Sequence, residues 1–139
     1  MTAEAVFSVA NMVALLSWIW LAAFPRAGAT KFVTGTLVPG LLAAVYVGIV
    51  AAVFGRVEGG FSSLAEVAIL FGNKWMLLAG WIHYLAFDLL VGGWIVGDAE
   101  KRGVRRWAVV PCLALTFLFG PAGWLLYRVV RAASAKVSR

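Results

Sequence analysis

Uncharged apolar stretches alternate with short polar segments along the whole chain. Four of these stretches are long enough to cross a membrane, since a spanning helix needs about 20 mostly apolar residues. Inside a bilayer the backbone polar groups find no water, and a helix satisfies them within the segment. The pattern therefore predicts an all-α polytopic membrane protein with four transmembrane helices in one domain over residues 1–139, the helices lying at residues 5–24, 32–55, 75–97 and 107–127.

The longest connection between predicted spans, residues 56–74, contains a short apolar segment of its own. Ser63 and Glu66 have the spacing of a helix-capping box, and apolar residues follow them. Gly72 favours the end of that helix, and Asn73 can cap the third span. We therefore expect a short interfacial helix between the second and third transmembrane helices.

The composition agrees with a membrane protein and excludes a soluble enzyme. Hydrophobic residues make up 63% of the chain and charged residues 13%, whereas about 25% of residues are charged in soluble globular domains. The net charge is +6, but the basic residues flank the spans, so a nucleic-acid partner is not expected. Four spans would put six Lys and Arg residues on each side, which leaves the orientation in the membrane undetermined.

The third predicted span contains the only acid and the only histidine found within the four spans, Asp88 and His83. An ionisable group at membrane depth is costly and is a functional candidate by default. Asp88 is a candidate proton donor, proton acceptor or ligand anchor, and the alternative is a carboxyl group bonded to Tyr84 or to a neighbouring helix. His83 can transfer protons near pH 7 or can form an interhelical hydrogen bond.

Helix geometry separates these two groups. At 100° per residue, Asp88 lies about 140° around the helix from His83, so a direct pair on this helix is not expected. Trp81, Tyr84 and Asp88 form one stripe, and His83 and Phe87 belong to another. The two groups can still border one cavity or pair with other helices.

Several other side chains have both a functional and a structural interpretation. Glu66 is either an acid near the membrane surface or part of the capping box, and Asn11 in the first span is expected to bond to another helix. One histidine and one cysteine, Cys112, provide too few ligands for a buried metal site, so no metal is expected. No cofactor is predicted either. Gly120 and Pro121 predict a kink in the fourth span.

Two long motifs resemble a known family. The run AGWIHYLAFDLLVGGWI at residues 79–95 and the run PCLALTFLFGPAGWLLY at residues 111–127 are similar to the abscisic-acid-deficient-four-like family over nearly the whole chain. Plant members are plastid membrane proteins needed to form neoxanthin from violaxanthin, an isomerisation that opens an epoxide and removes a proton without a redox cofactor. The resemblance implies carotenoid-linked function, with His83 and Asp88 as the matching acid and base candidates. The compact chain resembles a bacterial-type member, so the bacterial cytoplasmic membrane is the expected location.

The sequence thus predicts a protein that isomerises or otherwise tailors a carotenoid, or a related apolar isoprenoid, by acid–base chemistry. One alternative is a non-catalytic carotenoid-binding or assembly partner, and another is cleavage of a carotenoid to retinal or another apocarotenoid. The expected partners are the isoprenoid, the lipid bilayer, carotenoid enzymes and a second copy of the chain. The expected catalytic residues are His83 and Asp88, and the expected substrate-binding residues are Trp81, Tyr84, Phe87, Trp94, Glu66 and Asn11.

Overall fold

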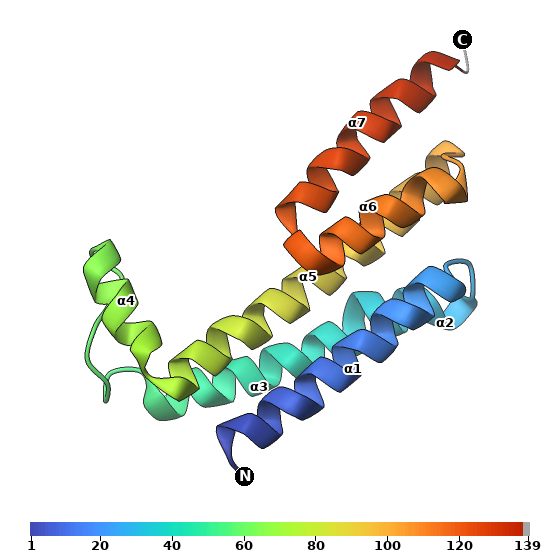
Figure 1. Cartoon of the computed structure of the whole chain (residues 1–139). Coiled ribbons are helices and arrows are strands. Elements are labelled where there is room, and N and C mark those ends of the chain that lie inside the picture. Colours follow the sequence, from blue (N-terminus) through green and yellow to red (C-terminus); the bar gives the residue numbers. More distant parts are fainter. Residues whose placement is uncertain (138–139) are drawn as a thin grey trace.

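The computed structural model describes residues 1–137, and no strand occurs among them. The predicted all-α class is therefore confirmed. Long helices lie side by side, and one short helix stands off at one end (Figure 1). The elements are α1 (Ala3–Ala23), α2 (Gly28–Phe32), the π-helical turn η1 (Val33–Leu37), α3 (Val38–Val53), α4 (Leu64–Gly72), α5 (Lys74–Arg102), α6 (Arg106–Phe119) and α7 (Pro121–Val137).

Three helical segments are long and apolar enough to cross a membrane: α1, the continuous run Gly28–Val53 that joins α2 to α3, and α5. These helices coincide with the first three predicted stretches, with boundaries shifted by a few residues. The run from α2 to α3 contains η1, which lies just before Pro39. Proline lacks an N–H group and its ring crowds the carbonyl four residues earlier, and the wider π-helical turn accommodates it.

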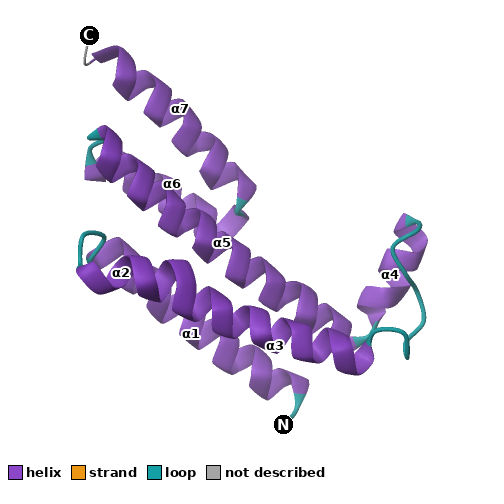
Figure 2. Cartoon of the chain, turned by 180° about the vertical axis from the view of Figure 1, so that it is seen from behind, coloured by secondary structure: helices purple, strands orange, loops and turns teal. Residues whose placement is uncertain are grey.

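The predicted fourth span is divided between two helices. α6 ends at Phe119, and α7 begins at Pro121 and runs back beside α6 (Figures 1 and 2). With 14 residues, α6 is about 21 Å long at about 1.5 Å per residue, shorter than the roughly 30 Å core of a bilayer. A kink within one span was predicted at Gly120 and Pro121, but the helix ends there and the chain reverses, so a count of four spans is not confirmed.

Two glycines allow this reversal. Gly120 links the two helices with φ +40° and ψ −93°, a conformation that side chains disfavour. A Cβ atom at Gly123 would collide with the backbone of Thr116, so the two helices approach each other closely there. Pro121 stands at the start of α7, where a helix does not use the missing N–H group and the fixed φ suits the first turn.

α5 is the central helix of the fold. It packs against α1, α3, α4, α6 and α7. Its inward side chains Ile82, Leu89 and Ile95 are fully buried. Because every other long helix touches α5, a polar group on its buried side is enclosed by several helices at once.

The short helix predicted between the second and third spans is α4. The Ser63 Oγ atom accepts a hydrogen bond from the Glu66 N–H group at 3.2 Å, which caps the first turn. Gly72 is the last residue of α4, and the Asn73 Oδ1 atom accepts from the Trp75 N–H group at 2.9 Å at the start of α5. The predicted helix and its predicted caps are therefore confirmed.

The reversal also redistributes positive charge between the two ends of the molecule. The Arg131 Nη1 atom of α7 lies 3.4 Å from the Asp98 Oδ2 atom near the end of α5, so α7 runs toward the same end as the α5–α6 turn. The even split of six and six assumed four spans, and it does not hold for this arrangement. Among the ten Lys and Arg side chains that the structure describes, eight lie toward this end, here called the basic end (Arg26, Lys31, Lys101, Arg102, Arg105, Arg106, Arg128 and Arg131), and two lie at the other (Arg56 and Lys74).

Candidate functional site

Asp88 lies halfway along α5, where the α6–α7 reversal meets it. Its side chain is buried, with 8% of the residue exposed, and its Oδ2 atom has no hydrogen-bond partner among the described residues. A Cβ atom at Gly120 would stand 2.5 Å from the Asp88 Oδ1 atom, so the carboxyl group sits directly against the tip of the hairpin. A buried carboxyl oxygen without a partner is costly, and such groups call for an explanation such as a catalytic role.

Tyr84 lies one turn before Asp88 and borders the same site. Its hydroxyl group donates a hydrogen bond to the Phe117 carbonyl oxygen of α6 at 3.3 Å, and it is also close enough to interact with the Asp88 carboxyl group. Its ring centroid lies 5.3 Å from that of Trp81, which is 40% exposed. The predicted stripe is therefore present, and it leads from the outer surface of α5 to the buried carboxyl group.

His83 lies on a different face of α5. The residue is exposed, and its ring centroid lies 4.6 Å from that of Phe87 and 5.7 Å from that of Tyr46 in α3. No hydrogen bond joins His83 to Asp88 within residues 1–137. This agrees with the separation expected from helix geometry, and the structure does not bring the two candidate groups into one site.

Asn11 and Trp81 join α1 to α5. The Trp81 Nε1–H group donates to the Asn11 Oδ1 atom at 3.0 Å, and the Asn11 Nδ2 group donates to the Phe7 carbonyl oxygen at 2.8 Å. The predicted interhelical bond of Asn11 is confirmed. Trp81 is thereby held in place beside Tyr84.

Two of the predicted substrate-contacting residues lie away from Asp88. Trp94 lies two turns further along α5 and packs edge-on against Tyr127 of α7, with ring centroids 5.9 Å apart. Glu66 belongs to α4, where its Oε2 atom accepts from the Ser62 N–H group at 3.3 Å. Its observed contacts are those of a capping residue, which agrees with the structural interpretation. Nowhere in residues 1–137 do three His, Cys, Asp or Glu side chains gather at one possible metal site.

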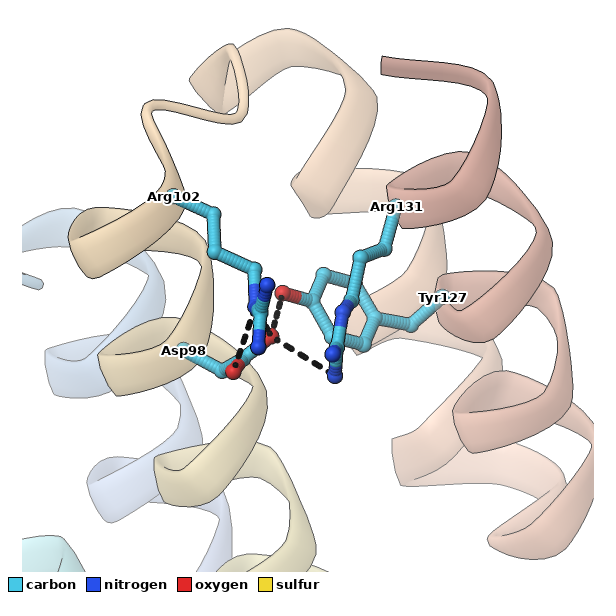
Figure 3. Close-up of polar contacts among 4 residues, drawn as sticks. All are labelled: Asp98, Arg102, Tyr127 and Arg131. Atoms are coloured by element: carbon cyan, nitrogen blue, oxygen red, sulfur yellow. Dashed lines mark hydrogen bonds and ion pairs between the residues drawn. The ribbon is translucent and has the colours of Figure 1, made fainter. Parts of the chain in front are cut away.

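Sequence reasoning missed a polar cluster that holds α7 against α5 (Figure 3). The Tyr127 hydroxyl group donates to the Asp98 Oδ2 atom at 2.7 Å, and the Arg131 Nη1 atom lies 3.4 Å from the same oxygen. The Arg102 Nε–H group donates to the Asp98 Oδ1 atom at 3.0 Å. The four-residue spacings of Asp98 to Arg102 and of Tyr127 to Arg131 were visible in the sequence, but a single straight fourth span would have kept the two pairs apart.

Replacing Asp98 with alanine is expected to destabilise the hairpin. Tyr127 is fully buried, and its hydroxyl group would lose its acceptor, which lowers the free energy of unfolding by about 1–3 kcal/mol. Thermal unfolding of the purified protein in detergent measures the change. The control is Glu100→Gln, which breaks the exposed ion pair with Lys31 and should cost under about 1 kcal/mol. Equal losses in the two variants would contradict a special role for the cluster.

The arrangement around Asp88 suits proton transfer in an apolar environment. A carboxyl group with a free oxygen can accept or donate a proton, and a neighbouring hydroxyl group can bond to it or to a bound molecule. The ring of Trp81 and the ring of Tyr84 provide flat apolar surfaces beside it. The surroundings of the Asp88 carboxyl group therefore combine a proton-transferring group with aromatic surfaces.

Comparison with known proteins gives one family. The family model described as ABA DEFICIENT 4-like matches residues 5–127, which is most of the chain. No curated protein and no solved structure matches the chain. The extent of the family match shows that the chain belongs to the ABA DEFICIENT 4-like family.

Proposed function

We propose that this member of the ABA DEFICIENT 4-like family binds a carotenoid or a related isoprenoid in the membrane and isomerises or otherwise tailors it by proton transfer at Asp88. Membership connects the chain with carotenoid-related membrane proteins, and its three apolar helices agree with a place in the bilayer. The observation that carries the proposed chemistry is the buried Asp88 carboxyl group with its unpartnered oxygen.

The proposed step needs no redox cofactor. A C–H bond of the substrate breaks, its electron pair forms a new C=C bond, and the proton moves to the Asp88 carboxylate. The same substrate takes up a proton at another carbon or at an oxygen whose C–O bond opens, so the composition does not change. General acid–base catalysis of this kind contributes about 10²–10⁴-fold to a rate.

Tyr84 and Trp81 position the substrate in this proposal. Tyr84 lies between the carboxyl group and the exposed ring of Trp81. His83 faces Phe87 and Tyr46 on another side of α5, so we assign the chemistry to Asp88 without His83. This departs from the expectation that the two residues act as an acid–base pair.

A second candidate function is binding without conversion. The side chains of Trp81, Phe87 and Trp94 all leave a large part of their surface exposed around α5. Such aromatic surfaces can hold an apolar pigment and present it to a partner enzyme. In this alternative the protein is a monomer or a homo-oligomer in the bacterial cytoplasmic membrane. It acts there as an assembly partner of that enzyme.

Expression in hosts that make β-carotene or oxygenated carotenoids separates these functions. The extracted pigments are chromatographed and their masses determined. A new pigment of unchanged mass supports isomerisation, and a product of lower mass indicates cleavage. Unaltered pigment that co-purifies with the protein supports the binding function and contradicts the catalytic one.

A further inference from the structure

A second candidate site lies at the basic end, away from Asp88. A pocket of about 330 Å³ opens between the end of α1, the end of α5 and the start of α6. Its inner walls are apolar and include the buried side chains of Leu21, Val96 and Leu113, one from each of these helices. Asp88 and Tyr84 do not line it, so this pocket is separate from the proposed catalytic site.

Two arginines stand at the mouth of this pocket. The Arg106 Nη2 group donates to the carbonyl oxygens of Ala22 and Ala23 at 2.6 and 3.1 Å, which fixes the guanidinium group at the end of α1. A guanidinium group has five N–H donors, so the donors outside Nη2 stay available to a ligand. Arg26 also lines the pocket, is exposed, and forms no ion pair in the described part of the chain.

The single acid at the mouth does not cancel this charge. The Glu100 Oε2 atom lies 3.4 Å from the Lys31 Nζ atom, so its charge is already paired. The mouth is therefore net positive, and it belongs to the end that holds eight of the ten described basic side chains. Helix ends with clustered Lys and Arg are typical of the membrane surface, where anionic headgroups lie.

We propose that this pocket binds one anionic membrane phospholipid. An acyl chain lies against the apolar walls formed by Leu21, Val96 and Leu113, and the headgroup phosphate accepts charge-assisted hydrogen bonds from Arg26 and Arg106. Charge complementarity favours this ligand over a neutral carotenoid, which has no group for the two arginines. The apolar walls favour it over free phosphate, which has no apolar part.

Native mass spectrometry of the purified protein tests this proposal. The delipidated protein is mixed with phosphatidylglycerol or with phosphatidylcholine of the same acyl chains, and bound lipid is counted. The wild type is expected to retain at least about fivefold more phosphatidylglycerol. Arg26→Gln is expected to remove most of this preference. The matched control is Arg105→Gln, which removes the same charge one residue before Arg106 but outside the pocket, and it should keep the preference.

A second variant tests the contribution of the apolar walls to lipid binding separately from that of the charges. Val110 lines the pocket and is partly exposed, so a larger side chain fits there without overpacking the core. Val110→Trp is expected to fill the pocket and to reduce phosphatidylglycerol binding while both arginines stay in place. Its melting temperature in detergent should remain near that of the wild type.

Several results would overturn the proposal. Equal binding of the two lipids, or equal losses in Arg26→Gln and Arg105→Gln, would mean only a general attraction of anions to the basic end. Inorganic phosphate that displaces phosphatidylglycerol completely would indicate a site for a free anion. β-Carotene that displaces it completely would assign the pocket to the pigment. None of these outcomes depends on conversion of a pigment, so the proposal and the proposed catalytic function can fail separately.

Discussion

Replacing Asp88 with asparagine is expected to reduce product formation by about 10²-fold or more while the protein remains folded. Asparagine keeps nearly the same shape but can neither take up nor release the proton, and general acid–base groups contribute about 10²–10⁴-fold. The side chain is buried against the hairpin tip, where solvent cannot easily replace its function. The measurement is the amount of new pigment per amount of membrane-inserted protein in a carotenoid-producing host.

Three companion variants make this result specific. Glu58→Gln removes an exposed carboxyl group in the connection between α3 and α4 and should convert pigment as the wild type does. Tyr84→Phe removes the neighbouring hydroxyl group and should lower conversion less than Asp88→Asn does. His83→Ala should retain conversion within about threefold, because His83 faces another side of α5 and general acid–base losses would exceed about 10²-fold. Conversion at the wild-type level by a folded Asp88→Asn variant would show that Asp88 is not the proton-transferring group.

Much of the helical framework was predictable from local patterns. Apolar runs of about 20 residues identify membrane helices because the bilayer sets their length. Ser63 and Asn73 were identifiable as caps because their side chains bond N–H groups only two or three residues away. These features depend on neighbours in the sequence, so the sequence alone is enough to place them.

The reversal between α6 and α7 depends on contacts that the sequence does not display. A glycine followed by a proline within an apolar run is typical of a kinked membrane helix as well as of a turn. What distinguishes them here is the close approach of Gly123 to Thr116 and the bonds of Asp98 to Tyr127 and Arg131. Those pairs come together only after the chain has turned back.

The candidate site was likewise predictable only where it depends on residues of one helix. The stripe of Trp81, Tyr84 and Asp88 follows from the 100° rotation per residue and is present. The contact of Asp88 with Gly120 depends on how the end of α6 packs against α5, so it could not be inferred from α5 alone. The exposed position of His83 beside Tyr46 likewise depends on how α3 packs against α5.

Different parts of the chain are expected to be exposed on the two sides of the membrane. Three crossing helices and a hairpin that returns to its starting side place the N-terminus and the described end of α7 on opposite sides. The basic end holds eight described Lys and Arg side chains against two at the other end, and this imbalance predicts that it faces the cytoplasm. Single cysteines at Gly103 and Ala133 should therefore be labelled only from the cytoplasmic side, and one at Ser62 only from the other.

A membrane-impermeant maleimide applied to sealed vesicles of each orientation measures this directly. The native Cys112 is buried, and it is first replaced by alanine so that all labelling comes from the introduced cysteine. The position at residue 133 separates the two topologies. A continuous fourth span would carry it across the membrane and give it the accessibility of Ser62, whereas the hairpin returns it to the side of Gly103. Labelling of residue 133 from the same side as Ser62 would therefore contradict the hairpin, and it would also restore the even distribution of positive charge expected for four spans.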